Sequence, residues 1–362
     1  MKKILFVANF KNDKFTEEIN SCLFRAICKL AEDYRFYGIC KSERPSGFTS
    51  NTIFKKVNLN CNENLWKNTV LPLMCLFNKN VPIYFPNANV SGLLPYSTPV
   101  ITMIKDILPL ELSEYFVSAN SEKNYRRQLQ TDINRSDLVF VPTEYIKTRL
   151  CEEFHISSEP VVLNFASLIS PEYLDLPLGV NSERYFFVET QNVSPEGLNE
   201  LLKIFIYLHT KAQNSAKLYL AGDIKFLSQE LLINLDVAQK LGVLREYENL
   251  SSPQRASLLK GAIAAILPSR IDAFPIAHLD AMRCSCPIVT DETPSVKEVC
   301  QDCAVYANIY DMDSYCDNLT RLEQDNEYRK DLIYKGLYRE KNFSWEHSAQ
   351  IFVENLELIS EK

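Results

Sequence analysis

Short apolar runs alternate along the chain with longer segments whose apolar residues recur at helical spacing. Runs of this kind, too short for a long helix, are typical of strands buried on both faces of a parallel sheet. In the first half of the chain they predict strands at 3–8, 35–40, 81–85, 99–104, 137–142 and 161–164. In the second half they predict strands at 185–189, 217–222, 243–247, 262–267, 287–289 and 302–307.

Helices are predicted between these strands, because apolar residues there return every three or four positions. The alternation of strand and helix predicts an α/β protein built from parallel sheets. The region 166–183 breaks the pattern, since it holds Pro171, Pro177 and Gly179 without periodicity. It is interpreted as a linker. The predicted helices cover 15–31, part of 66–77, 125–135, 145–154, 198–211, 228–241, 251–261, 312–337 and 346–359.

The most informative stretch is 262–300, which reads as a strand, a loop, a helix and a second strand. The loop carries Asp272, and Pro275 marks the start of the helix, where its missing N–H is tolerated. Asp280 follows eight positions after Asp272 and projects from the helix. Both acids are predicted to face the mouth of the sheet, at the carboxyl ends of the strands, where such units bind ligands.

The residue types in this stretch suit a nucleotide sugar. Carboxylates form strong, charge-assisted hydrogen bonds with sugar hydroxyls. The N–H groups of Ile276 and Ala277 at the helix start favour a phosphate through the helix dipole. A pair of acids beside N–H groups that can bind a phosphate therefore predicts a site for both the sugar and the phosphates of a nucleotide sugar. An ordinary βαβ unit with two surface acids is the plainer interpretation.

This stretch resembles the donor-binding signature of family 4 glycosyltransferases, the retaining enzymes with the GT-B fold. Both acids are Asp where the family usually has Glu, and the two loop glycines of the family are replaced by Ala273 and Pro275. The resemblance extends over nearly the whole chain. The matching positions are Pro268-Ser269, Asp272, Phe274, Asp280, Ala281-Met282 and Pro287-Ile288-Val289.

The resemblance implies two Rossmann-like domains facing a central cleft, with a C-terminal helix that crosses back to the N-terminal domain. The expected boundaries are 1–165 for the acceptor domain, 166–183 for the linker, 184–345 for the nucleotide-sugar domain and 346–362 for the crossing helix. The implied activity is a retaining transfer of a hexose-type sugar from a nucleotide-diphosphate donor to a glycan, lipid-linked or other glycoconjugate acceptor.

The resemblance also assigns roles to individual residues. Asp280 would hold the ribose hydroxyls and Asp272 the transferred sugar. Arg270, with the backbone amides from Phe274 to Ala277, would take the diphosphate, beside Ser269 at the end of the strand. Neither a metal nor a cofactor is expected, because the nucleotide-diphosphate sugar is itself the co-substrate.

Two further segments match family patterns with departures. Lys105-Asp106 matches a His-Asp pair near the donor sugar, with Lys in place of His, and both residues are taken as catalytic candidates. Thr190 and Gln191 lie where the family carries an Arg and a Lys for the diphosphate, and neither cation is present. Arg270 and Lys105 are the candidate replacements. Asn87 and Asn89 form a polar loop after a predicted strand, which is a further ligand position.

Composition narrows the class of protein. Residues 1–165 hold 20 Lys or Arg against 17 Asp or Glu, and the remainder holds 19 against 29. The acidic second half argues against nucleic acid as a partner. Eleven cysteines without a framework are typical of reduced thiols in a cytoplasmic protein. No apolar run reaches the length of a membrane span. The expected location is the cytoplasm, and the mildly basic first half would tolerate contact with the inner face of the membrane.

Three alternatives stay open at this point. A catalytically silent GT-B protein, acting as partner or scaffold of an active transferase, would explain the lost glycines and cations. A dinucleotide-binding oxidoreductase is weaker, because no Gly-x-Gly-x-x-Gly follows the first strand. A zinc site would need the pairs Cys284-x-Cys286 and Cys300-x-x-Cys303 to converge.

Overall fold

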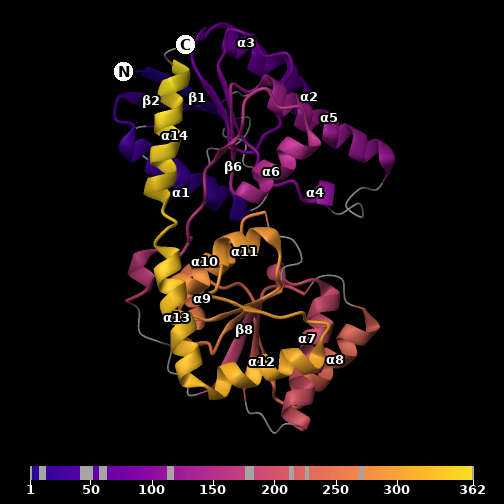
Figure 1. Ribbon diagram of the computed structural model, residues 1–362. Coiled ribbons are helices and arrows are strands. Elements are labelled where there is room, and N and C mark those ends of the chain that lie inside the picture. The colour runs from indigo at the N-terminus through magenta and orange to yellow at the C-terminus, as the bar shows by residue number, and fades with distance from the viewer. Residues whose placement is uncertain are drawn as a thin grey trace. The chain divides into compact units, whose positions relative to one another are not determined.

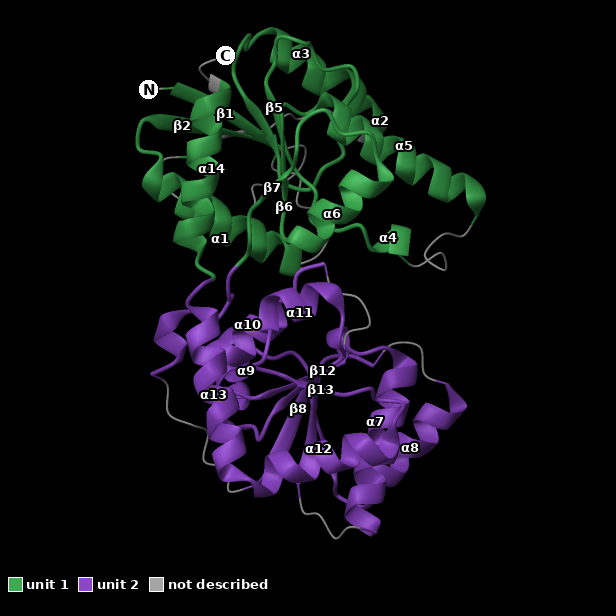
Figure 2. Cartoon of the chain, viewed as in Figure 1, with its two compact units in different colours: residues 1–165, 343–362 green, residues 166–342 purple. Residues whose placement is uncertain are grey.

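The computed structural model describes residues 2–7, 14–40, 52–56, 63–111, 118–175, 183–211, 216–224, 228–268 and 273–360. The chain divides into two compact units. Residues 1–165 and 343–362 form the first unit, and residues 166–342 form the second (Figure 2). Each unit is a parallel sheet with helices on both faces (Figure 1). This α/β architecture of two parallel sheets confirms the predicted fold class.

The first unit contains a seven-stranded sheet in the order β3-β2-β1-β4-β5-β6-β7. The sequence analysis missed strand β3, and it started helix α5 six residues too late. Ser118 and Ser121 form a capping box that fixes the true start of α5. The elements are β1 (Lys2–Val7), α1 (Lys14–Leu30), β2 (Tyr34–Cys40), β3 (Thr52–Lys56), α2 (Glu63–Leu65), η1 (Trp66–Val70), α3 (Leu71–Leu76), β4 (Ile83–Phe85), β5 (Val100–Met103), α4 (Leu108–Glu111), α5 (Ala119–Arg135), β6 (Leu138–Val141), α6 (Glu144–Glu153), β7 (Val161–Val162) and α14 (Trp345–Ser360).

One face of this sheet is covered by helices from opposite ends of the chain. Phe6 of β1 packs on Phe24 of α1, with ring centroids 4.3 Å apart. The C-terminal helix α14 lies beside α1 on the same face (Figure 1). Its Phe352 contacts Tyr84 of β4 and Phe140 of β6. The last twenty residues of the chain therefore complete the core of the first unit, and the predicted crossing back of the final helix is confirmed.

The second unit contains a six-stranded parallel sheet in the order β10-β9-β8-β11-β12-β13. Its elements are η3 (Pro171–Tyr173), β8 (Tyr185–Glu189), η4 (Thr190–Asn192), α7 (Pro195–Thr210), β9 (Lys217–Ala221), α8 (Gln229–Lys240), β10 (Leu244–Tyr247), α9 (Ser252–Gly261), β11 (Ala265–Leu267), α10 (Ile276–Arg283), β12 (Ile288–Thr290), α11 (Pro294–Cys300), β13 (Val305–Tyr306), α12 (Met312–Gln324) and α13 (Asn326–Glu340).

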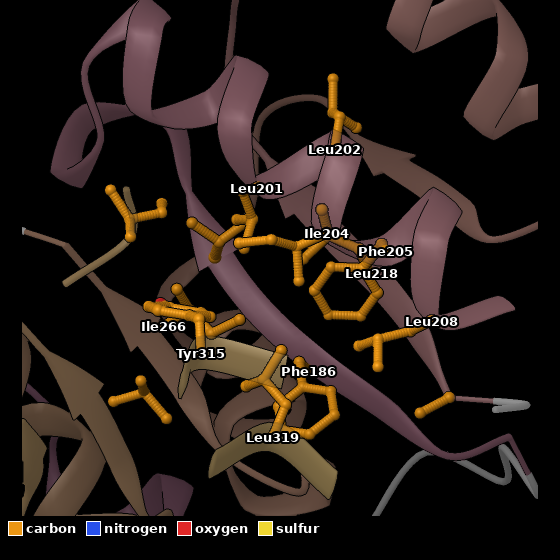
Figure 3. Close-up of a cluster of buried hydrophobic side chains, with 14 of the residues drawn as sticks. Phe186, Leu201, Leu202, Ile204, Phe205, Leu208, Leu218, Ile266, Tyr315 and Leu319 are labelled. Atoms are coloured by element: carbon orange, nitrogen blue, oxygen red, sulfur yellow. The ribbon is translucent and has the colours of Figure 1, made fainter. Parts of the chain in front are cut away.

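One face of the second sheet forms a large apolar core under α7, α8 and α12. Figure 3 shows side chains of α7 meeting those of the central strands, with Tyr315 and Leu319 of α12 beside them. Burial of each Leu, Ile or Phe side chain stabilises the folded state by about 1.5–3 kcal/mol relative to leaving it exposed. Ser194 caps α7 by accepting a hydrogen bond from Gly197 N (3.0 Å), and Pro195 occupies its first turn. The core holds β8 and β11 rigidly at the centre of the sheet.

Candidate functional site

Both sheets reverse their strand order at one position, and each reversal marks a candidate binding site. In the first sheet the order reverses between β1 and β4, and in the second between β8 and β11. Ligands of open parallel sheets bind at such reversals, outside the carboxyl ends of the strands. The residues that follow β4, β5, β8 and β11 are therefore the candidates for ligand binding.

In the first unit a cavity of about 400 Å³ opens at the ends of β4 and β5. It brings the two catalytic candidates Lys105 and Asp106 together with the polar loop that follows β4. Four side chains of α5 also reach it, and the sequence analysis did not assign any of them to a site. The lining residues are Thr16, Asn87, Ala88, Asn89, Ile104, Lys105, Asp106, Tyr125, Gln128, Leu129 and Asp132.

Lys105 is held in this cavity by two amide side chains. Its Nζ donates to Asn87 Oδ1 (2.8 Å) and to Asn20 Oδ1. Asn20 also donates through Nδ2 to Asn87 Oδ1 (3.1 Å). The ammonium group is a positively charged donor in the cavity, which suits a negatively charged group of a bound ligand.

The two acids of the cavity differ in environment. Asp106 accepts a hydrogen bond from Leu108 N (2.6 Å) at the start of α4. Asp132 is 2% exposed and accepts from Val90 N (2.6 Å) and Gln128 Nε2 (2.7 Å). Burial raises the pKa of Asp132 to about 6, against the lowering effect of these hydrogen bonds. The cavity thus offers donors and acceptors for a polyhydroxylated ligand.

In the second unit the end of β8 carries a buried ionic network. The carboxylate of Glu189, the last residue of β8, accepts hydrogen bonds from Arg255 Nε (2.8 Å) and Arg255 Nη2 (2.8 Å). Arg255, on α9, also donates through Nη1 to Asp280 Oδ2 (2.5 Å). The side chain of Glu189 is 10% exposed, that of Arg255 is 17% exposed and that of Asp280 is 1% exposed. Burial lowers the pKa of Arg255, but the two carboxylates outweigh it and hold the guanidinium charged.

The prediction that Asp280 faces the mouth of the sheet is wrong. Asp280 is fully buried, and its Oδ1 accepts from Ser167 Oγ (2.6 Å) and Leu168 N (2.7 Å). With Arg255 on Oδ2, three of roughly four acceptor positions of the carboxylate are occupied. Asp280 therefore ties α10 to α9 and to the segment at 167–168, and Oδ2 is the atom with capacity left.

The start of α10 also differs from the prediction. Pro275 is the N-cap and provides no side-chain cap. The amide of Ile276 donates to Phe274 O (2.9 Å), so it is not free for a phosphate as the sequence suggested. Phe274 and Ile276 are buried, and Ala277 is half-buried. Ser269, Arg270 and Asp272 lie outside the described residues.

Thr190 and Gln191 form the 3-10 turn η4 directly after β8. The loop after β9 packs closely on this turn, because a Cβ added to Gly222 would lie 2.5 Å from Thr190 Oγ1. Gly222 has φ +102°, a conformation that favours glycine, and its N donates to Tyr247 O (2.8 Å). These contacts fix η4 at the reversal point of the second sheet.

His278 and the four cysteines of the possible zinc site are buried in the second unit. His278 is 1% exposed and its Nε2 lies 2.8 Å from Thr290 Oγ1. Burial lowers the pKa of His278 to about 3, so it is a neutral core residue. Cys284, Cys286, Cys300 and Cys303 are all buried. Within the described ranges no three His, Cys, Asp or Glu side chains gather as metal ligands.

The sequence analysis missed Arg255, Glu189 and Asp132 as site residues. Arg255 lies in a helix that carries a second basic residue, Lys260, and nothing in the periodicity distinguishes the two. Glu189 ends an otherwise apolar strand. Its burial and its contact with Arg255 mark it as a site residue, and both are seen only in the folded structure.

Structural comparison shows that this chain has the same fold as several solved proteins. It matches sucrose-phosphate synthase from Thermosynechococcus elongatus with a TM-score of 0.72, 11% identity and 100% coverage of both chains. It matches trehalose 6-phosphate synthase from Burkholderia multivorans with a TM-score of 0.73 and 11% identity, over 100% of this chain and 99% of that one. HepE from Anabaena, solved with UDP and glucose, gives a TM-score of 0.70 and 16% identity over 99% and 100%.

Sequence comparison then identifies the second unit. Residues 177–338 match the model of the family "Glycosyl transferases group 1". The O-antigen chain mannosyltransferase B of Escherichia coli is 31% identical over 90 residues. That alignment spans 25% of this chain and 24% of the relative.

Proposed function

We propose that the protein is a retaining glycosyltransferase that moves a hexose-type sugar from a nucleotide-diphosphate donor to a glycan or other glycoconjugate acceptor, in the synthesis of a polysaccharide or glycoconjugate. The match of residues 177–338 to glycosyl transferases group 1 carries this proposal. The relative of Escherichia coli is named a mannosyltransferase, and HepE was solved with UDP and glucose. Both support a nucleotide-sugar donor.

The donor belongs at the reversal point of the second sheet. Asp272 is assigned to the transferred sugar, and Arg270, Ser269 and the amide of Ala277 to the diphosphate. Asp280 is assigned to a ribose hydroxyl through Oδ2, its remaining acceptor. Thr190 and Gln191 of η4 line the same end of the sheet.

The acceptor belongs in the cavity of the first unit. Lys105 and Asp106 lie there with the amides of Asn87 and Gln128, a mixture of donors and acceptors that suits sugar hydroxyls. Rate enhancement would come from stabilising negative charge on the leaving group, without a metal or a further cofactor. Lys105 is the catalytic candidate for a negatively charged group in this cavity, and Asp106 for a hydroxyl of the sugar.

A thermal-shift panel tests the donor assignment. UDP, GDP, ADP, CMP and dTDP at millimolar concentration are each compared without and with Mg²⁺. One nucleotide is expected to raise the melting temperature, equally with and without the metal. A ligand at about 100 times its Kd adds roughly 2.7 kcal/mol to the folded state. The absence of a shift from every nucleotide would contradict a donor site.

A catalytically silent GT-B protein is the second candidate, and one observation favours it. The described ionic network at the end of β8 joins two carboxylates to one guanidinium, so it carries one net negative charge. Such a network gives a diphosphate no attraction. A nucleotide that binds, but whose sugar is never transferred or hydrolysed, would support this candidate over the active enzyme.

The first unit also carries a feature suited to a peripheral membrane contact, which we include in the proposal. Leu73, Leu76 and Phe77 are 49%, 48% and 87% exposed on and after α3. No helix in the described part of the chain is both long and apolar enough to cross a bilayer. Membrane contact through this surface would therefore be interfacial.

Sedimentation with anionic phosphatidylglycerol vesicles tests that contact. The protein is expected to co-sediment at low salt, and Phe77→Ser is expected to reduce the bound fraction several-fold, because it removes an apolar ring that is 87% exposed. Tyr334→Ser is the control, since Tyr334 is 72% exposed in the second unit. Equal binding of both variants and the unchanged protein would argue against this surface.

A further inference from the structure

The loop after β4 has a backbone that is costly to hold. Ala88 has φ 53° and Asn89 has φ 66°, so two consecutive residues with side chains adopt the left-handed conformation. Residues with side chains adopt this conformation rarely, Asn more readily than Ala, and two in succession persist where the surroundings impose them. Something outside the loop must therefore stabilise this conformation.

That stabilisation comes from α5 through Asp132. Its Oδ2 accepts from Asn89 N (3.2 Å), and its Oδ1 accepts from Val90 N (2.6 Å) and from Gln128 Nε2 (2.7 Å). Gln128 Nε2 also donates to Val90 O (3.0 Å). The carboxylate is 2% exposed, so water does not compete for these hydrogen bonds.

The conformation of this loop sets the position of Asn87 in the cavity. Asn87 Oδ1 accepts from Lys105 and Asn20. Its Nδ2 is buried and lacks a hydrogen-bond partner within the described part of the chain. A buried donor without a hydrogen-bond partner destabilises the folded state. A ligand oxygen in the cavity that Asn87 lines would satisfy it.

We propose that Asp132 is a positioning residue of the first-unit site, whose ionised carboxylate holds residues 87–90 in the shape that presents Asn87 to a sugar hydroxyl. The inference rests on the proposed function for the identity of the ligand. It rests on the contacts of Asp132 alone for the conformation of the loop.

Protonation of Asp132 releases this loop. A proton on Oδ2, the oxygen with the longer contact, turns an acceptor of Asn89 N–H into a donor facing it. Burial raises the pKa of Asp132 to about 6, so the change falls between pH 7.5 and 5. The charged and titratable groups nearby are Lys67 from η1, Lys105 and Asp106 after β5, and Tyr125 on α5.

The sign of the effect separates loop release from unfolding. Because the pKa of Asp132 is raised on folding, the folded state binds more protons than the unfolded state between about pH 4 and 6. The contribution of Asp132 to global stability therefore increases as the pH falls through this window. The hydrogen bonds to the loop weaken over the same window.

Hydrogen exchange of the full chain, followed by mass spectrometry, tests the proposal. For Asp132→Asn at pH 7.5 the peptide covering 86–92 is expected to exchange roughly 10–100-fold faster, as loss of charge-assisted hydrogen bonds implies. In the unchanged protein the same peptide is expected to lose protection at pH 5, after correction for intrinsic exchange. Asp132→Asn is expected to show no such pH step.

Asp137→Asn is the matched control, because Asp137 Oδ2 accepts from Val100 N (2.8 Å) and contacts a different strand. It is expected to leave the 86–92 peptide unchanged. Equal protection of that peptide in Asp132→Asn and the unchanged protein would overturn the positioning role.

D-mannose, D-glucose and D-galactose at saturating concentration serve as probes of the ligand. At least one is expected to slow exchange at 86–92 in the unchanged protein and not in Asp132→Asn. Protection by a sugar that persists in Asp132→Asn would overturn the link between Asp132 and the ligand. Loss of loop protection in the variant, with no response to any sugar in the unchanged protein, would overturn the sugar assignment and the proposed acceptor site, but not the contact between Asp132 and the loop.

Discussion

Arg255→Met is expected to lower the free energy of unfolding of the second unit by about 3–5 kcal/mol, the range for breaking a buried ion pair. Arg255 is the cation between Glu189 and Asp280, which are 7% and 0% exposed. Met fills a similar volume without charge, so both carboxylates remain buried and repel each other. Urea denaturation followed by a probe of the second unit measures the effect.

Arg245→Met is the matched control for this experiment. Arg245 lies in the same sheet, on edge strand β10, with its side chain 49% exposed, 3.5 Å from Glu183. An exposed ion pair contributes about 0–1 kcal/mol, so the control should change stability little. Equal losses in the two variants would contradict a buried network centred on Arg255.

Phe352→Ala is expected to lower the free energy of unfolding of the first unit by about 3–5 kcal/mol, as for other buried Phe to Ala changes. Phe352 is 1% exposed on α14, with its ring 5.0 Å from that of Tyr84 and 5.3 Å from that of Phe140. The substitution opens a cavity between the C-terminal helix and the sheet. Thermal or urea unfolding observed in the first unit measures the loss.

Leu358→Ala, on the same helix, is the control, because Leu358 is 63% exposed. Its effect should stay within about 0.5 kcal/mol. If Phe352→Ala behaved like Leu358→Ala, α14 would not be part of the core that the contacts describe. The comparison thus tests whether the end of the chain stabilises its beginning.

Much of the fold could be read from the sequence, since periodicity reports which faces of an element are buried. Ile83 and Phe85 pack toward η1 and α3, whereas Tyr84 packs on α14 on the opposite face, as strand alternation requires. Ser251 and the proline of the first turn mark where α9 begins, as the sequence predicted, whereas α7 begins at Pro195, three residues before its predicted start. Strand β3 was missed because TIFKK is short and ends in two charges.

The sites were less predictable, because a charged residue looks the same in sequence whether it is exposed or buried. Asp280 has the spacing of a ligand-facing acid, but the structure surrounds it with Ser167, Leu168 and Arg255. Ser167 lies 113 positions away, and no local pattern can report such a contact. Lys105 and Asp106 were recognised, but Asp132 and Gln128 enter their cavity from a helix that sequence treats as surface.

The sequence by itself determined the order of strands and helices and the location of the 262–300 signature, because these depend on neighbours along the chain. The tertiary structure alone decided which polar groups are desolvated and with whom they pair. Arg255 joins Glu189 to Asp280, and Asp132 holds the loop at 87–90, through contacts between residues 25 to 66 positions apart. The energy of a charge depends on the dielectric and partners around it, and only the folded chain sets those.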